Sequence, residues 1–165
     1  MKNKKIFNAI LAIFVFANTG CFAQTPVCGS TGCDYTIDWD VGIWDGASVS
    51  DGETICIEGN PGNGIRNELI IKNLLGTANS KIIVMPCSDL VTFIPGATNV
   101  KFCINFENCK YFILTGDGIE NQKYGIKLLL NDNINVDNGI KFGPYCKEYN
   151  INNIEISNKK DTKYL

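Results

Sequence analysis

Short apolar pairs recur along most of the chain, with one variable residue between the two members of each pair. The first is Ile55/Ile57 and the last is Ile154/Ile156. Because successive side chains of a β-strand point to opposite faces, each pair marks one face of a predicted short strand. The pairs between these two are Leu69/Ile71, Ile82/Val84, Val91/Phe93, Phe102/Ile104, Phe112/Leu114, Ile126/Leu128 and Ile140/Phe142.

The apolar pairs return at intervals of 9 to 14 residues, and the last intervals are all 14. Gly125-Ile126-Lys127-Leu128 returns as Gly139-Ile140-Lys141-Phe142 and then as the looser Asn153-Ile154-Glu155-Ile156. Glycine and asparagine are frequent between the pairs, and both tolerate the left-handed backbone that a sharp turn needs. Many short strands at regular spacing predict either a β-sandwich or barrel, or a β-solenoid.

Two observations favour the solenoid. Asn138-Gly139 is a dipeptide of the hairpin type, but it stands just before a repeat start rather than between two paired strands. Similar short strands at one recurring interval also suit coils stacked in register. We therefore predict an all-β parallel solenoid of about three to five coils, with either two or three strands per coil.

Three phrases carry a family resemblance. Gly52-Glu53-Thr54-Ile55-Cys56-Ile57-Glu58-Gly59 resembles the entry strand of right-handed parallel β-helix repeat proteins. Leu69 to Ala78 is similar to their next coil, and Asn108 to Gly118 resembles a further one. The resemblance spans roughly residues 50–158 and implies the fold of pectate lyases and their non-enzymatic relatives. The three phrases thus indicate a secreted bacterial type of β-helix, represented by its N-terminal portion.

The resemblance implies no catalytic residue. Lyases of this fold use clustered acidic residues and a basic residue, and hydrolases use paired carboxylates, commonly with a histidine. The chain has no histidine, and its one arginine, Arg66, follows the first predicted strand. We expect a non-catalytic module that contacts polysaccharide or other surface components. The alternative is the N-terminal part of a polysaccharide lyase or glycoside hydrolase whose catalytic coils lie beyond Leu165.

The N-terminal segment has the composition of a secretory signal peptide. Three lysines precede an apolar run of about a dozen residues, which is too short to span a bilayer. Cleavage after Ala23 predicts a secreted or cell-surface protein, and lipidation at Cys21 is the minority alternative. Beyond the signal peptide (1–23) we expect an N-terminal cap (24–50), the coils (51–158) and a charged tail (159–165), with an open or truncated C-terminal end.

The net charge limits the classes of molecule that the chain could bind, and the cysteine content bears on its disulfides. The formal charge of −2 falls to −5 when Lys2, Lys4 and Lys5 are removed, so nucleic acid is an unfavourable partner. No second apolar segment approaches membrane-spanning length. Export would place the seven remaining cysteines in an oxidising compartment. Cys28 and Cys33 are the predicted local disulfide.

Two sets of side chains are candidate binding residues. Acidic residues in predicted turns would provide oxygen ligands for calcium, although solvated turns explain them equally; these are Asp117, Glu120, Asp132 and Asp137. Aromatic side chains that suit the apolar faces of sugar rings form the second set, with core packing as the alternative. Tyr111, Tyr124 and Trp44 are the main aromatic candidates, and Trp39 and Tyr145 are the others. Calcium is the one cofactor that these residues suggest, and the sequence does not predict the oligomeric state.

Overall fold

A computed structural model describes residues 32–87, 90–95, 102–117, 119, 122–131 and 138–159 of the 165-residue chain. The predicted signal peptide and nearly all of the charged tail lie outside these residues. The described residues form thirteen short strands and no helix. The all-β prediction is therefore confirmed for this part of the chain.

The strands form three parallel sheets, here called A, B and C. Sheet A consists of β1 (Tyr35–Ile37), β3 (Thr54–Ile57), β6 (Ile82–Pro86), β9 (Lys110–Thr115) and β12 (Lys147–Asn152). Sheet B consists of β2 (Ile43–Asp45), β5 (Leu69–Lys72), β8 (Phe102–Glu107) and β11 (Asn138–Phe142). Sheet C consists of β4 (Ile65–Arg66), β7 (Val91–Phe93), β10 (Ile126–Asn131) and β13 (Ile154–Lys159).

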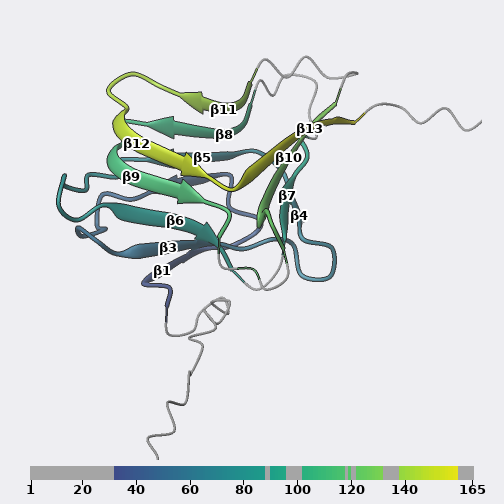
Figure 1. Cartoon of the computed structure of the whole chain (residues 1–165), viewed down its shortest axis with the longest axis horizontal. Coiled ribbons are helices and arrows are strands. Elements are labelled where there is room, and N and C mark those ends of the chain that lie inside the picture. The colour runs from purple at the N-terminus through teal and green to yellow at the C-terminus, as the bar shows by residue number, and fades with distance from the viewer. Residues whose placement is uncertain are drawn as a thin grey trace, which may run out of the picture.

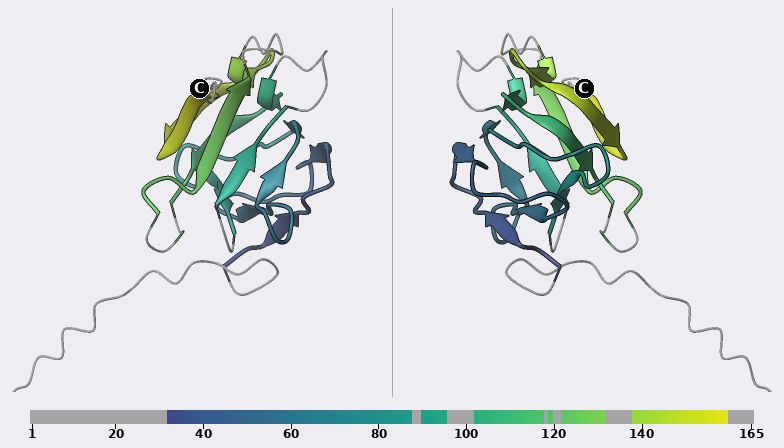
Figure 2. Two further views of the ribbon diagram at one scale, coloured as in Figure 1. Left: turned by 90° about the vertical axis from the view of Figure 1, so that its right-hand side faces the viewer. Right: turned by 90° about the vertical axis from the view of Figure 1, so that its left-hand side faces the viewer.

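From β3 onwards the chain visits sheets A, C and B in strict rotation, and from β5 onwards each strand pairs in parallel with the strand three elements earlier. Figures 1 and 2 show the resulting stack, which rises from β1 at one end to β11, β12 and β13 at the other. This is a parallel β-helix of about four coils with three strands per coil. Strands β1 and β2 lie in the predicted cap region, and they already pair with β3 and β5 as part of the stack.

The apolar pairs fill the inside of the helix as continuous columns. Ile55, Val84 and Leu114 occupy the same register position on successive coils and are fully buried. Rings from different sheets also meet inside the helix, because Phe106 of β8 and Phe112 of β9 have centroids 4.5 Å apart. The stack is therefore held by like side chains lying above one another and by contacts between the sheets of one coil.

The 14-residue letter repeat has a different origin from the coil repeat. Strands β10 and β13 are equivalent in sheet C, with Ile126 paired to Ile154 and Leu128 paired to Ile156. The segment between them in the repeat, around Ile140, is β11 of sheet B. The repeat therefore marks successive sides of the helix, and one coil spans two of its periods there.

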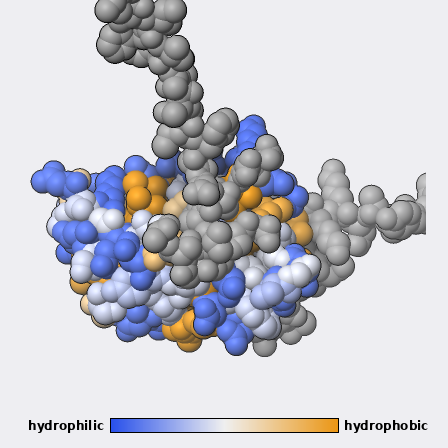
Figure 3. Space-filling model, turned by 90° about the horizontal axis from the view of Figure 1, so that it is seen from below, coloured by the Kyte–Doolittle hydropathy of each residue, from blue (hydrophilic) through white to orange (hydrophobic). Residues whose placement is uncertain are grey.

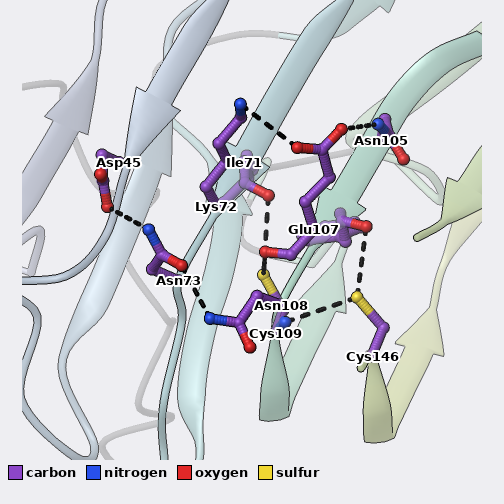
Figure 4. A network of polar contacts seen from close by, with 10 residues as sticks. Asp45, Ile71, Lys72, Asn73, Asn105, Glu107, Asn108, Cys109 and Cys146 are labelled. Atoms are coloured by element: carbon purple, nitrogen blue, oxygen red, sulfur yellow. Dashed lines mark hydrogen bonds and ion pairs between the residues drawn. The ribbon is translucent and has the colours of Figure 1, made fainter. Parts of the chain in front are cut away.

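An asparagine column turns the corner after sheet B. Asn73 and Asn108 follow β5 and β8, and both adopt the left-handed conformation, with φ of 57° and 54°. The Nδ2 of Asn108 donates to the Oδ1 of Asn73 at 2.8 Å, and the Nδ2 of Asn73 donates to the Oδ1 of Asp45 at 3.0 Å (Figure 4). Asparagine suits both demands of this corner, because it tolerates positive φ and its amide links one coil to the next.

We expect Asn108→Ala to be less stable than Asn108→Gly. Both variants lose the amide contact, but only alanine must bear the left-handed backbone, so the glycine variant should be more stable by about 0.5–1 kcal/mol. Urea unfolding monitored by circular dichroism measures the difference. An alanine variant as stable as the glycine variant would show that this backbone conformation is unimportant.

At the end of the stack formed by β11, β12 and β13, the last apolar residues of the inner columns are exposed. Tyr149 and Ile151 lie directly above Phe112 and Leu114 in register, but both are exposed. Ile156, above Leu128, is 56% exposed. No described residue pairs with the outer edges of these strands. The open or truncated C-terminal end stays a prediction, because residues 160–165 lie outside the described part of the chain.

Candidate functional site

The three main aromatic candidates do not form one platform. Trp44 lies on sheet B, Tyr111 on sheet A, and Tyr124 just before β10 of sheet C. The indole of Trp44 packs edge-on against Tyr35, with centroids 6.1 Å apart. The Nζ of Lys123 lies 4.9 Å from the ring centroid of Tyr124. Because the three residues belong to three different sheets, they do not lie along one flat face.

Only one of the four predicted calcium ligands lies in the described part of the chain. Asp117 ends the turn after β9, where its Oδ2 accepts a hydrogen bond from the Thr115 hydroxyl at 2.6 Å and its Oδ1 accepts one from Asn153. Glu120, Asp132 and Asp137 lie outside the described residues. Among the described residues, no three acidic, histidine or cysteine side chains gather as a metal site. Calcium binding therefore stays a prediction.

The predicted pairing of Cys28 with Cys33 is wrong. Cys33 is bonded to Cys56, with Cα atoms 5.6 Å apart. The cause is the parallel pairing of β1 with β3, which brings the segment before Tyr35 alongside β3. Proximity in the sequence favoured the local pair, whereas the coil repeat joins residues 23 positions apart. Cys28 itself lies outside the described residues, and Cys87 also takes part in a disulfide.

A cleft of about 400 Å³ lies beside the first coils, and we call it the Trp39 cleft. Three segments form it: the connection between β1 and β2, the turn after β3, and the stretch from β4 to β5. None of the three is a long strand, which is why apolar periodicity does not reveal the site. Its lining residues are Trp39, Asp40, Val41, Gly42, Asn60, Asn63, Ile65, Arg66, Asn67 and Glu68.

Arg66 joins the three walls of the Trp39 cleft. Its side chain is 2% exposed, and its guanidinium donates to three backbone carbonyls. Its Nη2 donates to Val41 at 2.7 Å, and its Nη1 donates to Glu58 at 2.9 Å and to Ile37 at 3.4 Å. The guanidinium also lies 5.5 Å from the ring centroid of Phe93. Arg66 therefore fixes the β1–β2 connection against the end of β3.

The buried guanidinium remains a cation at neutral pH. Burial lowers the pKa of Arg66 to about 10, and the carboxylates of Glu58, Asp40 and Asp38 oppose this shift. Its Nε has no hydrogen-bond partner among the described residues. The other two donor nitrogens are occupied by the chain's own carbonyls. Arg66 therefore acts on the cleft mainly as a structural cation.

The remaining lining suits a polyhydroxylated ligand. The indole of Trp39 is 41% exposed, and Ile65 beside it is also exposed. Asn60, Asn63 and Asn67 supply amides, and Asp40 and Glu68 supply carboxylates at the same cleft. The turn is held by its own backbone, because Gly64 N–H donates to the Asn60 carbonyl at 2.8 Å. An aromatic face beside amide and carboxylate groups suits a sugar, whose ring can stack on the indole while its hydroxyls form hydrogen bonds.

Sequence reasoning found part of this site. Trp39 was among the lesser aromatic candidates, and Arg66 stood out only as the single arginine. The cluster of three asparagines within residues 60–67 was the available signal, but turn formation explained it equally well.

Seen from the β1 end of the stack (Figure 3), the described surface is mostly hydrophilic, with apolar residues in small separate groups.

The comparisons with known proteins found no matching family model, no matching curated protein and no matching solved structure. Within the described residues, no helix has the length and apolar character needed to cross a bilayer.

Proposed function

We propose that this chain is an exported or cell-surface β-helix module that binds polysaccharide without cleaving it, and that the Trp39 cleft is the binding site. The observation that carries the proposal is the exposed indole of Trp39 at a cleft lined by amides and carboxylates. The Cys33–Cys56 disulfide supports export, because disulfides persist in oxidising compartments. The same proposal is supported by the sequence resemblance to right-handed parallel β-helix repeat proteins, many of which bind or act on polysaccharides.

The charge of the cleft favours a neutral glycan over an acidic one. Asp40 and Glu68 both line it, and Asp38 is close enough to influence the pKa of Arg66. The only cationic side chain of the lining, Arg66, is buried and held by backbone carbonyls. The carboxylates of a uronate chain would therefore be repelled by Asp40 and Glu68, and the described lining residues offer no free cation to offset this repulsion. We therefore expect neutral polysaccharides to bind more tightly.

Paired carboxylates at one cleft also support a second candidate function, glycoside hydrolysis. Hydrolases of this kind place one acid and one base on either side of the scissile bond. Asp40 and Glu68 line the same cleft, as such a pair would. A release of reducing ends from neutral polysaccharides, lost in both Asp40→Asn and Glu68→Gln, would identify an enzyme in place of the binding module.

Replacing Trp39 with alanine should weaken glycan binding by roughly 5- to 150-fold. The variant loses the aromatic face on which a sugar ring would stack, and such a stacked ring contributes on the order of 1–3 kcal/mol. Affinity electrophoresis in gels containing neutral polysaccharides, with polygalacturonate as the acidic comparison, measures the change.

Tyr145→Ala is the matched control, because Tyr145 is an 81% exposed aromatic residue in the turn before β12, outside the cleft. Its retardation should equal that of the wild type. Equal retardation of Trp39→Ala and the wild type on a retained polysaccharide would rule out the Trp39 cleft as the site.

A further inference from the structure

Cys109 and Cys146 occupy equivalent positions on neighbouring coils. Lys110 and Lys147 are direct partners in the pairing of β9 with β12, so the residues just before them face each other. The backbone confirms this alignment, because Lys147 N–H donates to the Cys109 carbonyl at 3.1 Å. Directly opposed residues of parallel strands have Cα atoms about 4.8 Å apart, which lies within the range that a disulfide spans.

The two thiols lie among the same backbone carbonyls at this corner of the helix. The Cys109 N–H donates to the Cys146 Sγ at 3.4 Å. The Cys146 thiol donates to the Phe106 carbonyl at 3.2 Å, and the Cys109 Sγ lies 3.3 Å from the Glu107 carbonyl and 3.6 Å from the Ile71 carbonyl (Figure 4). These are weak donor bonds of sulfur, so a rotation of the Cys109 side chain toward Cys146 gives up little energy.

The two cysteines differ in exposure, and this difference decides which thiol an oxidant reaches first. Cys146 is partly exposed, whereas Cys109 is fully buried. Burial raises the pKa of Cys109 to about 12, and nearby Cys146 adds to that shift. An oxidant in solution therefore meets Cys146 first. The Cys33–Cys56 disulfide indicates that the folded chain is compatible with oxidising conditions.

We propose that Cys109 and Cys146 are a covalent modification site, at which a small-molecule disulfide oxidant creates a cross-link between the last two coils. The Cys146 thiolate attacks one sulfur of the oxidant, forming a mixed disulfide and releasing one thiolate. Cys109 then loses its proton and attacks the Cys146 sulfur, forming the Cys109–Cys146 bond and releasing the second thiolate. Two protein thiols are oxidised and one oxidant disulfide is reduced to two thiols.

The cross-link would tie down the exposed outer strand of sheet A. Every residue of β12 is exposed, and β12 forms the outer edge of sheet A. A bond from Cys146 to Cys109 ties the residue before β12 to the residue before β9. We therefore expect it to slow the opening of the last coil and to raise the melting temperature by several degrees, as closure of a loop of this length does.

The experiment treats the purified full chain with glutathione disulfide at pH 8 and digests it without reduction for mass spectrometry. The expected product is a Cys109–Cys146 linked peptide, preceded by a glutathione adduct on Cys146, with a loss of two free thiols per chain. Cys103→Ala is the matched control, because Cys103 is equally buried in β8 but lies opposite Gly139, and it should give the same product.

Two further variants keep the proposal falsifiable. Cys109→Ala should stop at a stable glutathione adduct on Cys146, and Cys146→Ser should give no adduct at Cys109. A wild-type chain that keeps its Cys146 adduct for many hours without forming the linked peptide would overturn the proposal. So would a linked peptide that contains Cys103 in place of Cys109.

Discussion

Replacing Phe112 with alanine should lower the free energy of unfolding by about 3–5 kcal/mol. Phe112 is fully buried in β9, between Ile82 and Tyr149 in register. Its ring stacks on Tyr149, with centroids 5.7 Å apart, and on Phe106 of the adjoining sheet B. Removing the ring leaves a cavity in the middle of an inner column, and the neighbouring coils cannot close it without breaking their register. Urea unfolding followed by circular dichroism measures the loss.

The matched comparison is Tyr149→Ala, one coil further along the same column. Tyr149 is 37% exposed, so its removal opens the surface at the end of the stack and leaves no enclosed cavity. We expect a loss of about 1–2 kcal/mol, clearly smaller than that of Phe112→Ala. Equal losses for the two variants would contradict the columnar core described above.

Replacing Arg66 with methionine should lower the free energy of unfolding by about 2–3 kcal/mol and abolish glycan binding. Methionine fills much of the space but leaves the carbonyls of Val41 and Glu58 without their guanidinium donor, whereas the Ile37 carbonyl keeps its bond from the Glu58 N–H. Each carbonyl left buried without a partner costs about 1–3 kcal/mol, and relief from burying a charge offsets part of the sum. The connection that carries Trp39 would then lose its anchor.

Arg66→Lys separates charge from geometry. Lysine keeps the positive charge, but its single ammonium cannot reach carbonyls on both sides of the cleft as the forked guanidinium does. We expect it to fall between the wild type and Arg66→Met in both unfolding and affinity electrophoresis. A methionine variant with wild-type stability and wild-type retardation would show that Arg66 does not organise the Trp39 cleft.

The sequence predicted the stack well because its signal is repeated. All nine apolar pairs fall on strands, from Ile55/Ile57 in β3 to Ile154/Ile156 in β13. One-sided strands are visible in a sequence because alternation follows from the geometry of the strand itself. The remaining strands were not predicted for different reasons. β4 has only two residues, whereas Tyr35/Ile37 in β1 and Tyr149/Ile151 in β12 alternate as the nine pairs do and were overlooked.

The disulfide and the cleft could not be found in the same way. Cys33 and Cys56 meet because of the coil repeat, whose length was open between two and three strands per coil. The Trp39 cleft combines residues from a connection, a turn and a two-residue strand, so no local period links Trp39 with Asn60 and Arg66. Their proximity follows from the stacking of the first two coils, which becomes known only with the register.

The most direct test of the account is the fluorescence of Trp39 during a glycan titration. The chain contains two tryptophans, so Trp44→Phe leaves Trp39 as the only reporter and keeps an aromatic ring against Tyr35. With a neutral oligosaccharide that calorimetry shows to bind, the emission of Trp39 should change and saturate at the same ligand concentrations. Emission that stays constant while calorimetry reaches saturation would place the binding site elsewhere on the molecule.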